Sequence, residues 1–169
     1  MSVDQAPPDD TTDVIGVESE HTYGTRYQDG SLITRADEIP WTEWGMPGTW
    51  FKLLDVNDDF GWFVFLLKVE PGTQAPDHHH YSAAFAFTLE GWWGYEGRIV
   101  QSGQFIKEAG GINHAPIVDP ENGTVMLAFG NGPVAGLNPD GSIAGIIDIE
   151  WMYNAAAANG AADHIIRRV

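Results

Sequence analysis

The sequence predicts an antiparallel all-β domain, a barrel or jelly roll, that ends in one C-terminal α-helix. From about Tyr27 onward, short runs of aromatic and β-branched residues alternate with clusters of Gly, Pro, Asn and Asp, the pattern of strands joined by turns. At 169 residues, with neither an internal repeat nor an interior linker, the chain has the size of one domain. We therefore expect a single all-β core.

Five runs are the clearest strand candidates: residues 50–56, 61–69, 82–89, 92–100 and 124–129. Turn-forming residues separate them, for example Asn57-Asp58-Asp59 and Asn122-Gly123, which tolerate tight or left-handed backbone. The repeating unit is therefore strand, turn, strand.

The two ends of the chain differ from this pattern. Residues 149–162 include WMYNAAAANGAA, a stretch of good helix formers that predicts the helix, with Asn159-Gly160 marking its end. Residues 1–20 contain six acids, two prolines and no Lys or Arg. We expect residues 1–22 to form a flexible acidic leader without a catalytic role, and residues 23–169 to form the domain.

Composition narrows the classes of partner and site. The net charge of −16 repels phosphate backbones and anionic membranes, so neither nucleic acid nor a membrane is an expected partner. No apolar run approaches the roughly 18 residues of a membrane span, and the N-terminus lacks a secretory signal, so we expect a cytoplasmic protein. Without cysteine, disulfides and thiolate sites are excluded, and any metal ligands are imidazoles or carboxylates.

Three consecutive histidines, His78-His79-His80, are the most distinctive feature of the sequence. Residues two apart in a strand share a face, so His78 and His80 can bind one ion while His79 points away. His114 follows a glycine-rich bend and can supply a third imidazole. Three protein ligands leave coordination positions open, as in catalytic metal sites. We interpret His79, His21 and His164 as ordinary structural or surface histidines.

The spacing around these histidines resembles the first motif of the cupin superfamily. Gly72 is followed by five residues, His78, one residue, His80, three residues, Ala84, six residues and Gly91. Many cupins carry Glu at the position that Ala84 occupies here. The resemblance implies a metal site made of three histidines without this acid.

The second cupin motif is also in register. Gly103 is followed by five residues, Ala109, one residue, Gly111, two residues and His114. Ala109 stands where the motif has proline, so this chain departs from the pattern there. Two motifs in register imply the cupin jelly roll and the ligand set His78, His80 and His114.

Shorter matches place the chain near the 2,4'-dihydroxyacetophenone dioxygenase-like subgroup of three-histidine non-haem iron cupins. They are Ile39-Pro40-Trp41, Trp50-Phe51-Lys52-Leu53-Leu54, Leu89-Glu90-Gly91, Tyr95-Glu96 and Asn138-Pro139-Asp140-Gly141. The resemblance implies that Fe(II) and O2 cleave a carbon–carbon bond next to a ketone, in an aromatic α-hydroxyketone or diketone-like substrate. It also makes Glu96 and Glu108 candidate catalytic residues, with Glu96 expected to face inward as a base or hydrogen-bond acceptor near the metal.

Two alternatives remain open from the sequence. A metal-dependent lyase, isomerase or hydrolase could use Zn, Ni or Mn, because imidazole suits these metals as well as iron. A non-enzymatic metal- or ligand-binding cupin is the other. In either case the aromatic content and the exposed strand edges predict a homodimer or homotetramer.

Overall fold

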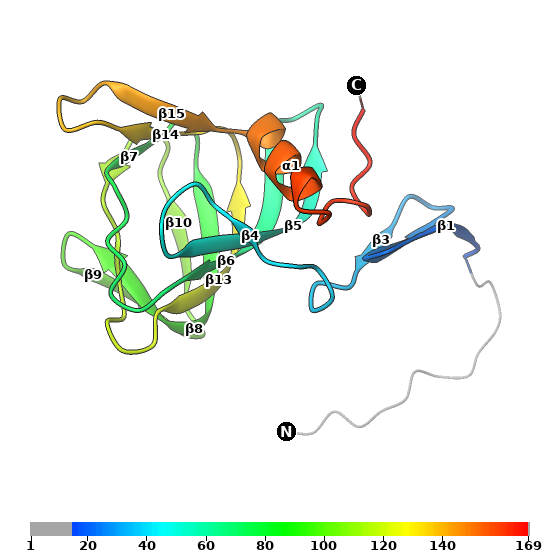
Figure 1. The fold of residues 1–169 in the computed structure, drawn as a ribbon, viewed down its shortest axis with the longest axis horizontal. Helices are drawn as coiled ribbons and strands as arrows, with labels where there is room; N and C mark the ends of the chain where they lie inside the picture. The colour runs from blue at the N-terminus through cyan, green and yellow to red at the C-terminus, as the bar shows by residue number, and fades with distance from the viewer. Residues whose placement is uncertain (1–14, 169) are drawn as a thin grey trace.

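The computed structural model describes residues 15–168, which form fifteen strands and one helix (Figure 1). The strands make three sheets, and the two larger sheets enclose the core of a barrel closed on one side by the helix. The predicted all-β fold with a C-terminal helix is therefore confirmed.

A small three-stranded sheet precedes the barrel and lies to one side of it (Figure 1). It consists of β1 (Val17–His21), β2 (Gly24–Tyr27) and β3 (Leu32–Thr34). Residues 17–21 of the expected leader, residues 1–22, form β1, which pairs with β2 in an antiparallel hairpin. Residues 1–14 lie outside the described part of the chain, so the rest of that prediction is untested.

The largest sheet runs in the order β10-β8-β13-β6-β5-β4, with β9 and β12 also paired to β8. Its strands are β4 (Thr42–Glu43), β5 (Thr49–Asn57), β6 (Trp62–Val69), β8 (Ala84–Tyr95), β9 (Arg98–Gln101), β10 (Phe105–Glu108), β12 (Ile117–Val118) and β13 (Thr124–Gly130). A second sheet, of order β11-β7-β14-β15, contains β7 (His78–His80), β11 (Asn113–His114), β14 (Val134–Leu137) and β15 (Ile143–Ile147).

Strand β8 differs from the two strands predicted at 82–89 and 92–100. It continues through Gly91 (φ 66°), where a side chain would collide with the carbonyl group of Gly123. The pairing of β8 with β13 shifts register beside Leu89, which is a β-bulge. Before the bulge Ala86 and Thr88 are buried, whereas after it Trp93 is buried. The bulge therefore reverses which alternate residues face the barrel interior.

The helix α1 (Ile149–Ala158) covers one side of the barrel and packs against β5, β15 and β4. The Asp148 side chain caps its N-terminus by accepting a hydrogen bond from the Trp151 N–H at 2.9 Å. Met152 and Ala156 are fully buried against the core. The helix ends at Ala158, at the expected Asn159-Gly160 and four residues before the bound of 162, because the chain enters a left-handed turn at Gly160 (φ 69°). No helix among residues 15–168 is long and apolar enough to cross a membrane.

Candidate metal centre

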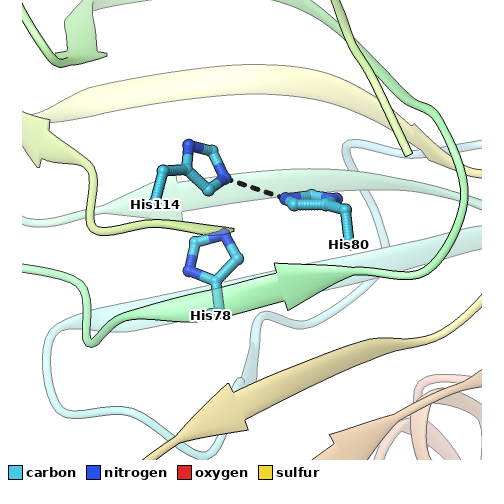
Figure 2. Close-up of side chains that lie close together, drawn as sticks. All are labelled: His78, His80 and His114. Atoms are coloured by element: carbon cyan, nitrogen blue, oxygen red, sulfur yellow. Dashed lines mark hydrogen bonds between the residues drawn. The ribbon is translucent and has the colours of Figure 1, made fainter. Parts of the chain in front are cut away.

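Three imidazoles converge inside the barrel, two from β7 and one from its neighbour β11 (Figure 2). His78 and His80 share one face of β7, and antiparallel pairing places His114 directly opposite His78. His79 faces the other way, and its Nδ1 hydrogen-bonds to Oδ1 of Asn113 at 2.6 Å. The structure therefore brings together the three predicted ligands and leaves out His79.

The three rings are close enough to bind one ion. One nitrogen from each of His78, His80 and His114 can be chosen so that all three lie within 4.8 Å of one another. The Nε2 atoms of His80 and His114 are 2.9 Å apart. Two nitrogens bound at right angles to one ion, each at about 2.1 Å, lie about 3.0 Å apart. The observed spacing therefore fits two adjacent coordination positions.

Burial keeps all three imidazoles neutral at physiological pH. Loss of hydration lowers the pKa of His80 to about 4 and that of His114 to about 3, and the neighbouring histidines of the cluster add to both shifts. Desolvation also lowers the pKa of His78. Because only neutral imidazole has a free lone pair, the cluster is ready to coordinate a cation.

A backbone contact orients the ring of His78. Its Nδ1 lies 3.1 Å from the carbonyl oxygen of Pro76, so in the neutral ring this nitrogen donates and Nε2 carries the lone pair. The Nδ1 atoms of His80 and His114 are buried without a hydrogen-bond partner. The donor set and its orientation thus fit a divalent metal.

Glu108 is the acidic residue that the fold places beside this cluster. It is buried at the end of β10, with Oε1 3.4 Å from Nδ1 of His114 and Oε2 3.7 Å from Nε2 of His80. Desolvation raises the pKa of the Glu108 carboxyl to about 7, and the neighbouring Tyr95 hydroxyl opposes part of this shift. Of the two acids predicted from the sequence, Glu108 is the one in the site.

The expectation that Glu96 faces inward is wrong. Glu96 lies in the turn between β8 and β9 with φ 50°, where its side chain is exposed. Its carboxylate pairs with Arg98 at 2.8 Å on the surface. The physical reason is the bulge in β8, which puts Tyr95 on the inner face and leaves its neighbour in the turn.

Tyr95 is the site residue that sequence reasoning missed. Its ring packs edge-on against the ring of His114, with centroids 4.1 Å apart and planes at 82°. Burial and the nearby Glu108 carboxylate raise the pKa of the Tyr95 hydroxyl to about 12, so the group remains protonated. Only the bulge at Leu89 reveals its inward orientation, and strand alternation alone does not locate that bulge.

The histidine cluster lies on the wall of a cavity of about 140 Å³. Small residues line the part of the cavity wall next to Glu108. They are Ala84 and Ala86 of β8 and the residues paired with them on β13, Gly130 and Ala128. Large apolar side chains line much of the rest: Trp44, Phe63, Phe65, Leu67, Trp93, Met126 and Ile147. The cavity thus combines a metal-binding wall with an apolar interior.

A protein-family comparison matches residues 29–135 to the ChrR cupin-like domain. The chain belongs to this cupin family. The match contains the three histidines, Glu108 and both cupin motifs. A comparison with curated proteins finds none that is significantly similar in sequence.

Solved structures confirm the cupin fold. An RmlC-like cupin protein from Ralstonia eutropha JMP134 is 18% identical, with a TM-score of 0.68 over 79% of this chain and 88% of that chain. A candidate acetylacetone dioxygenase from Methylibium petroleiphilum PM1 is 20% identical, with a TM-score of 0.68 over 74% and 93%. An acetylacetone dioxygenase from Acinetobacter johnsonii is 13% identical, with a TM-score of 0.62 over 91% and 98%. At these identities the likeness establishes the fold alone.

Proposed function

We propose that this cupin is a dioxygenase that uses Fe(II) and O2 to cleave a carbon–carbon bond next to a ketone. The proposed substrate is an aryl α-hydroxyketone or a small diketone-like compound. The observation that carries the proposal is the cluster of three neutral histidines on the wall of an apolar cavity. One similar fold belongs to an acetylacetone dioxygenase and another to a candidate acetylacetone dioxygenase, which supports this reaction class.

The three histidines are the proposed metal ligands. His78, His80 and His114 would hold the ion with one nitrogen each, and a set of three protein ligands would leave further coordination positions for substrate and O2. When bound, the metal supplies Lewis-acid polarisation of the ketone and hydroxyl oxygens and a binding position for O2. The paired strands β7 and β11 carry the ligands, and β14 pairs with the other edge of β7, so the backbone hydrogen bonds of the sheet position the three rings.

The cavity supports a small substrate with one apolar body. A dry protein cavity of about 150 Å³ accommodates a benzene-sized molecule, so about 140 Å³ suits a single ring or a short diketone. Phe63, Phe65 and Trp93 exclude water and provide aromatic contacts for such a ligand. Within this cavity, Glu108 is the carboxylate available for a role in the reaction.

The test is oxygen uptake by anaerobically purified protein loaded with Fe(II), with 2,4'-dihydroxyacetophenone and acetylacetone as substrates. The α-hydroxyketone and O2 together contain the atoms of one aryl carboxylic acid and one formic acid. With ¹⁸O2 we expect one labelled oxygen atom in each product, measured by mass spectrometry. His114→Ala should abolish uptake, whereas His79→Ala, whose ring faces away from the cluster, should retain it.

No uptake with any aryl ketone or diketone, together with tightly bound zinc or nickel, would contradict the proposal. It would favour a non-oxidative cupin lyase, isomerase or hydrolase, or a non-enzymatic binding protein. Labelled oxygen in only one product would also contradict it, because a dioxygenase transfers both atoms of O2.

A further inference from the structure

The pairing of β10 with β8 places the carboxylate of Glu108 beside the three histidines. The strands that carry these histidines, β7 and β11, contain no acidic residue. In this register Glu108 lies directly opposite Ala84, and both residues line the cavity. The methyl group of Ala84 leaves space that a larger side chain would fill. Position 84 is also where the first cupin motif often has its acid, so an acid from the next strand occupies the same part of the cavity.

The carboxylate of Glu108 has the neutral Tyr95 hydroxyl as a neighbour, but no Lys or Arg of residues 15–168 pairs with it. Glu108 is only 7% exposed, and its Oε1 has no hydrogen-bond partner. The basic side chains within 4.0 Å of its carboxylate are His80 and His114. A neutral hydroxyl offsets only part of the cost of burying a carboxylate, so a bound cation would stabilise Glu108 in this position.

The two oxygens of this carboxylate lie beside two of the histidines: Oε1 is 3.4 Å from Nδ1 of His114, and Oε2 is the oxygen on the side of the Nε2 atoms. Oε2 lies 3.7 Å from Nε2 of His80, and that nitrogen lies 2.9 Å from Nε2 of His114. Two ligand atoms at neighbouring positions of one ion are typically about 3 Å apart. Oε2 would have to move less than about 1 Å toward Nε2 of His80 to reach this spacing. A small change in the side-chain torsions of Glu108 allows such a movement.

We propose that Glu108 is a fourth protein ligand of the metal, supplied from β10 across the strand pair at Ala84. This inference rests on the proposed role of the three histidines as metal ligands but not on the reaction with O2. The site then combines three neutral imidazoles with one carboxylate and reduces the net charge of a bound divalent ion from two to one.

Zinc binding to the metal-free protein, without substrate or O2, tests this assignment. The affinity is measured by competition with a chromophoric chelator, and infrared difference spectra report which carboxylates change on binding. At pH 8.5 we expect Glu108→Gln to lower the affinity by more than about 100-fold, beyond the loss typical of an outer contact, and to remove the bands of a metal-bound carboxylate from the difference spectrum. The matched control is Glu90→Gln, on the exposed part of β8, which should change neither.

Moving the carboxylate from position 108 to position 84 tests whether Glu108 acts as a metal ligand or only stabilises the structure. In Ala84→Glu/Glu108→Ala the carboxylate returns to the cavity from β8, and we expect both the affinity and the infrared bands to recover. An unchanged difference spectrum in Glu108→Gln, or no recovery in the double variant, would overturn the proposal. If zinc binds through Glu108 but the iron-loaded protein consumes no O2, only the proposed dioxygenase activity fails.

Discussion

Buried histidines occur in two regions of this molecule, and their surroundings differ. His164, in the C-terminal segment, is 0% exposed and its Nε2 lies 3.0 Å from the backbone oxygen of Leu53. Its ring also packs edge-on against Tyr23 at a centroid distance of 6.0 Å. In the cluster, by contrast, Nε2 of His80 faces another histidine and no backbone carbonyl.

Desolvation lowers the pKa of His164 and that of each histidine in the cluster, so burial alone does not distinguish them. The difference lies in what the ring nitrogen contacts. A nitrogen that donates to a backbone carbonyl ties a chain segment to the barrel, whereas ring nitrogens of separate histidines that contact one another can bind a shared cation. We therefore expect substitutions in the two regions to affect different properties.

The largest effect should come from removal of one ligand. His80→Ala removes one of the two imidazoles in adjacent coordination positions, so we expect zinc affinity to fall by at least about 100-fold, more than for loss of an outer contact. Chelator competition on the metal-free protein measures it. A loss below tenfold would place the ion outside the cluster.

The corresponding change at the C-terminal histidine should affect stability and leave metal binding intact. His164→Ala deletes a fully buried ring and its contact with Leu53, so we expect about 2–4 kcal/mol lower free energy of unfolding. Urea denaturation of the metal-free protein provides the value. His21→Ala, at a partly exposed position, is the control, and equal losses in both variants would contradict the structural role of His164.

Metal addition should stabilise the protein only through the cluster. A free metal concentration of 100 times the dissociation constant adds about 2.7 kcal/mol, which for a domain of this size raises Tm by roughly 5–10 °C. The shift should be retained in His164→Ala and absent in His80→Ala. Thermal scans with and without a chelator measure it, and an equal shift in both variants would refute the separation of the two regions.

The smallest effect concerns the pH dependence of stability in the metal-free protein. The folded-state pKa of His80 is about 4 and that of His114 about 3, both below the ordinary 6.5, so their contribution to stability is lost as pH falls below about 6.5. Glu108 acts in the opposite direction. Its folded-state pKa of about 7 exceeds the ordinary 4.5, so its contribution is present below pH 4.5 and is lost as pH rises through 7.

Between pH 7 and pH 6 the two effects partly cancel in the wild-type protein. Glu108→Gln removes the opposing contribution, and we expect this variant to lose about 1 kcal/mol more stability than the wild type over that interval. Urea denaturation at the two pH values gives the difference. Parallel losses in the two proteins would show that Glu108 does not titrate in this range.

The sequence predicted those parts of the fold and site that depend on local pattern. Strands β5, β6 and β13 lie within one residue of their predicted bounds, because alternation and turn residues define each of them locally. The spacing i, i+2 on one strand predicted that His78 and His80 act together, and this is a local pattern. His114 was added from the resemblance to the second cupin motif, because no local pattern brings it to the other two.

Features that depend on long-range pairing were not predictable in this way. The bulge at Leu89 arises where β8 pairs with β13, and it placed Tyr95 inside and Glu96 outside, contrary to simple alternation. The contact between His164 and Leu53 joins residues 111 positions apart. The position of Glu108 opposite Ala84 likewise appears only once the register of β10 and β8 is known.

The central claim is that His78, His80 and His114 hold one catalytic metal per chain. Metal content by plasma mass spectrometry, on anaerobically purified wild-type protein and on the three single alanine variants, tests it most directly. We predict close to one iron per wild-type chain and a large loss of metal in each variant, with His79→Ala unaffected. Full metal content in any variant of the three histidines, or no metal in the wild type after incubation with Fe(II), would contradict the account.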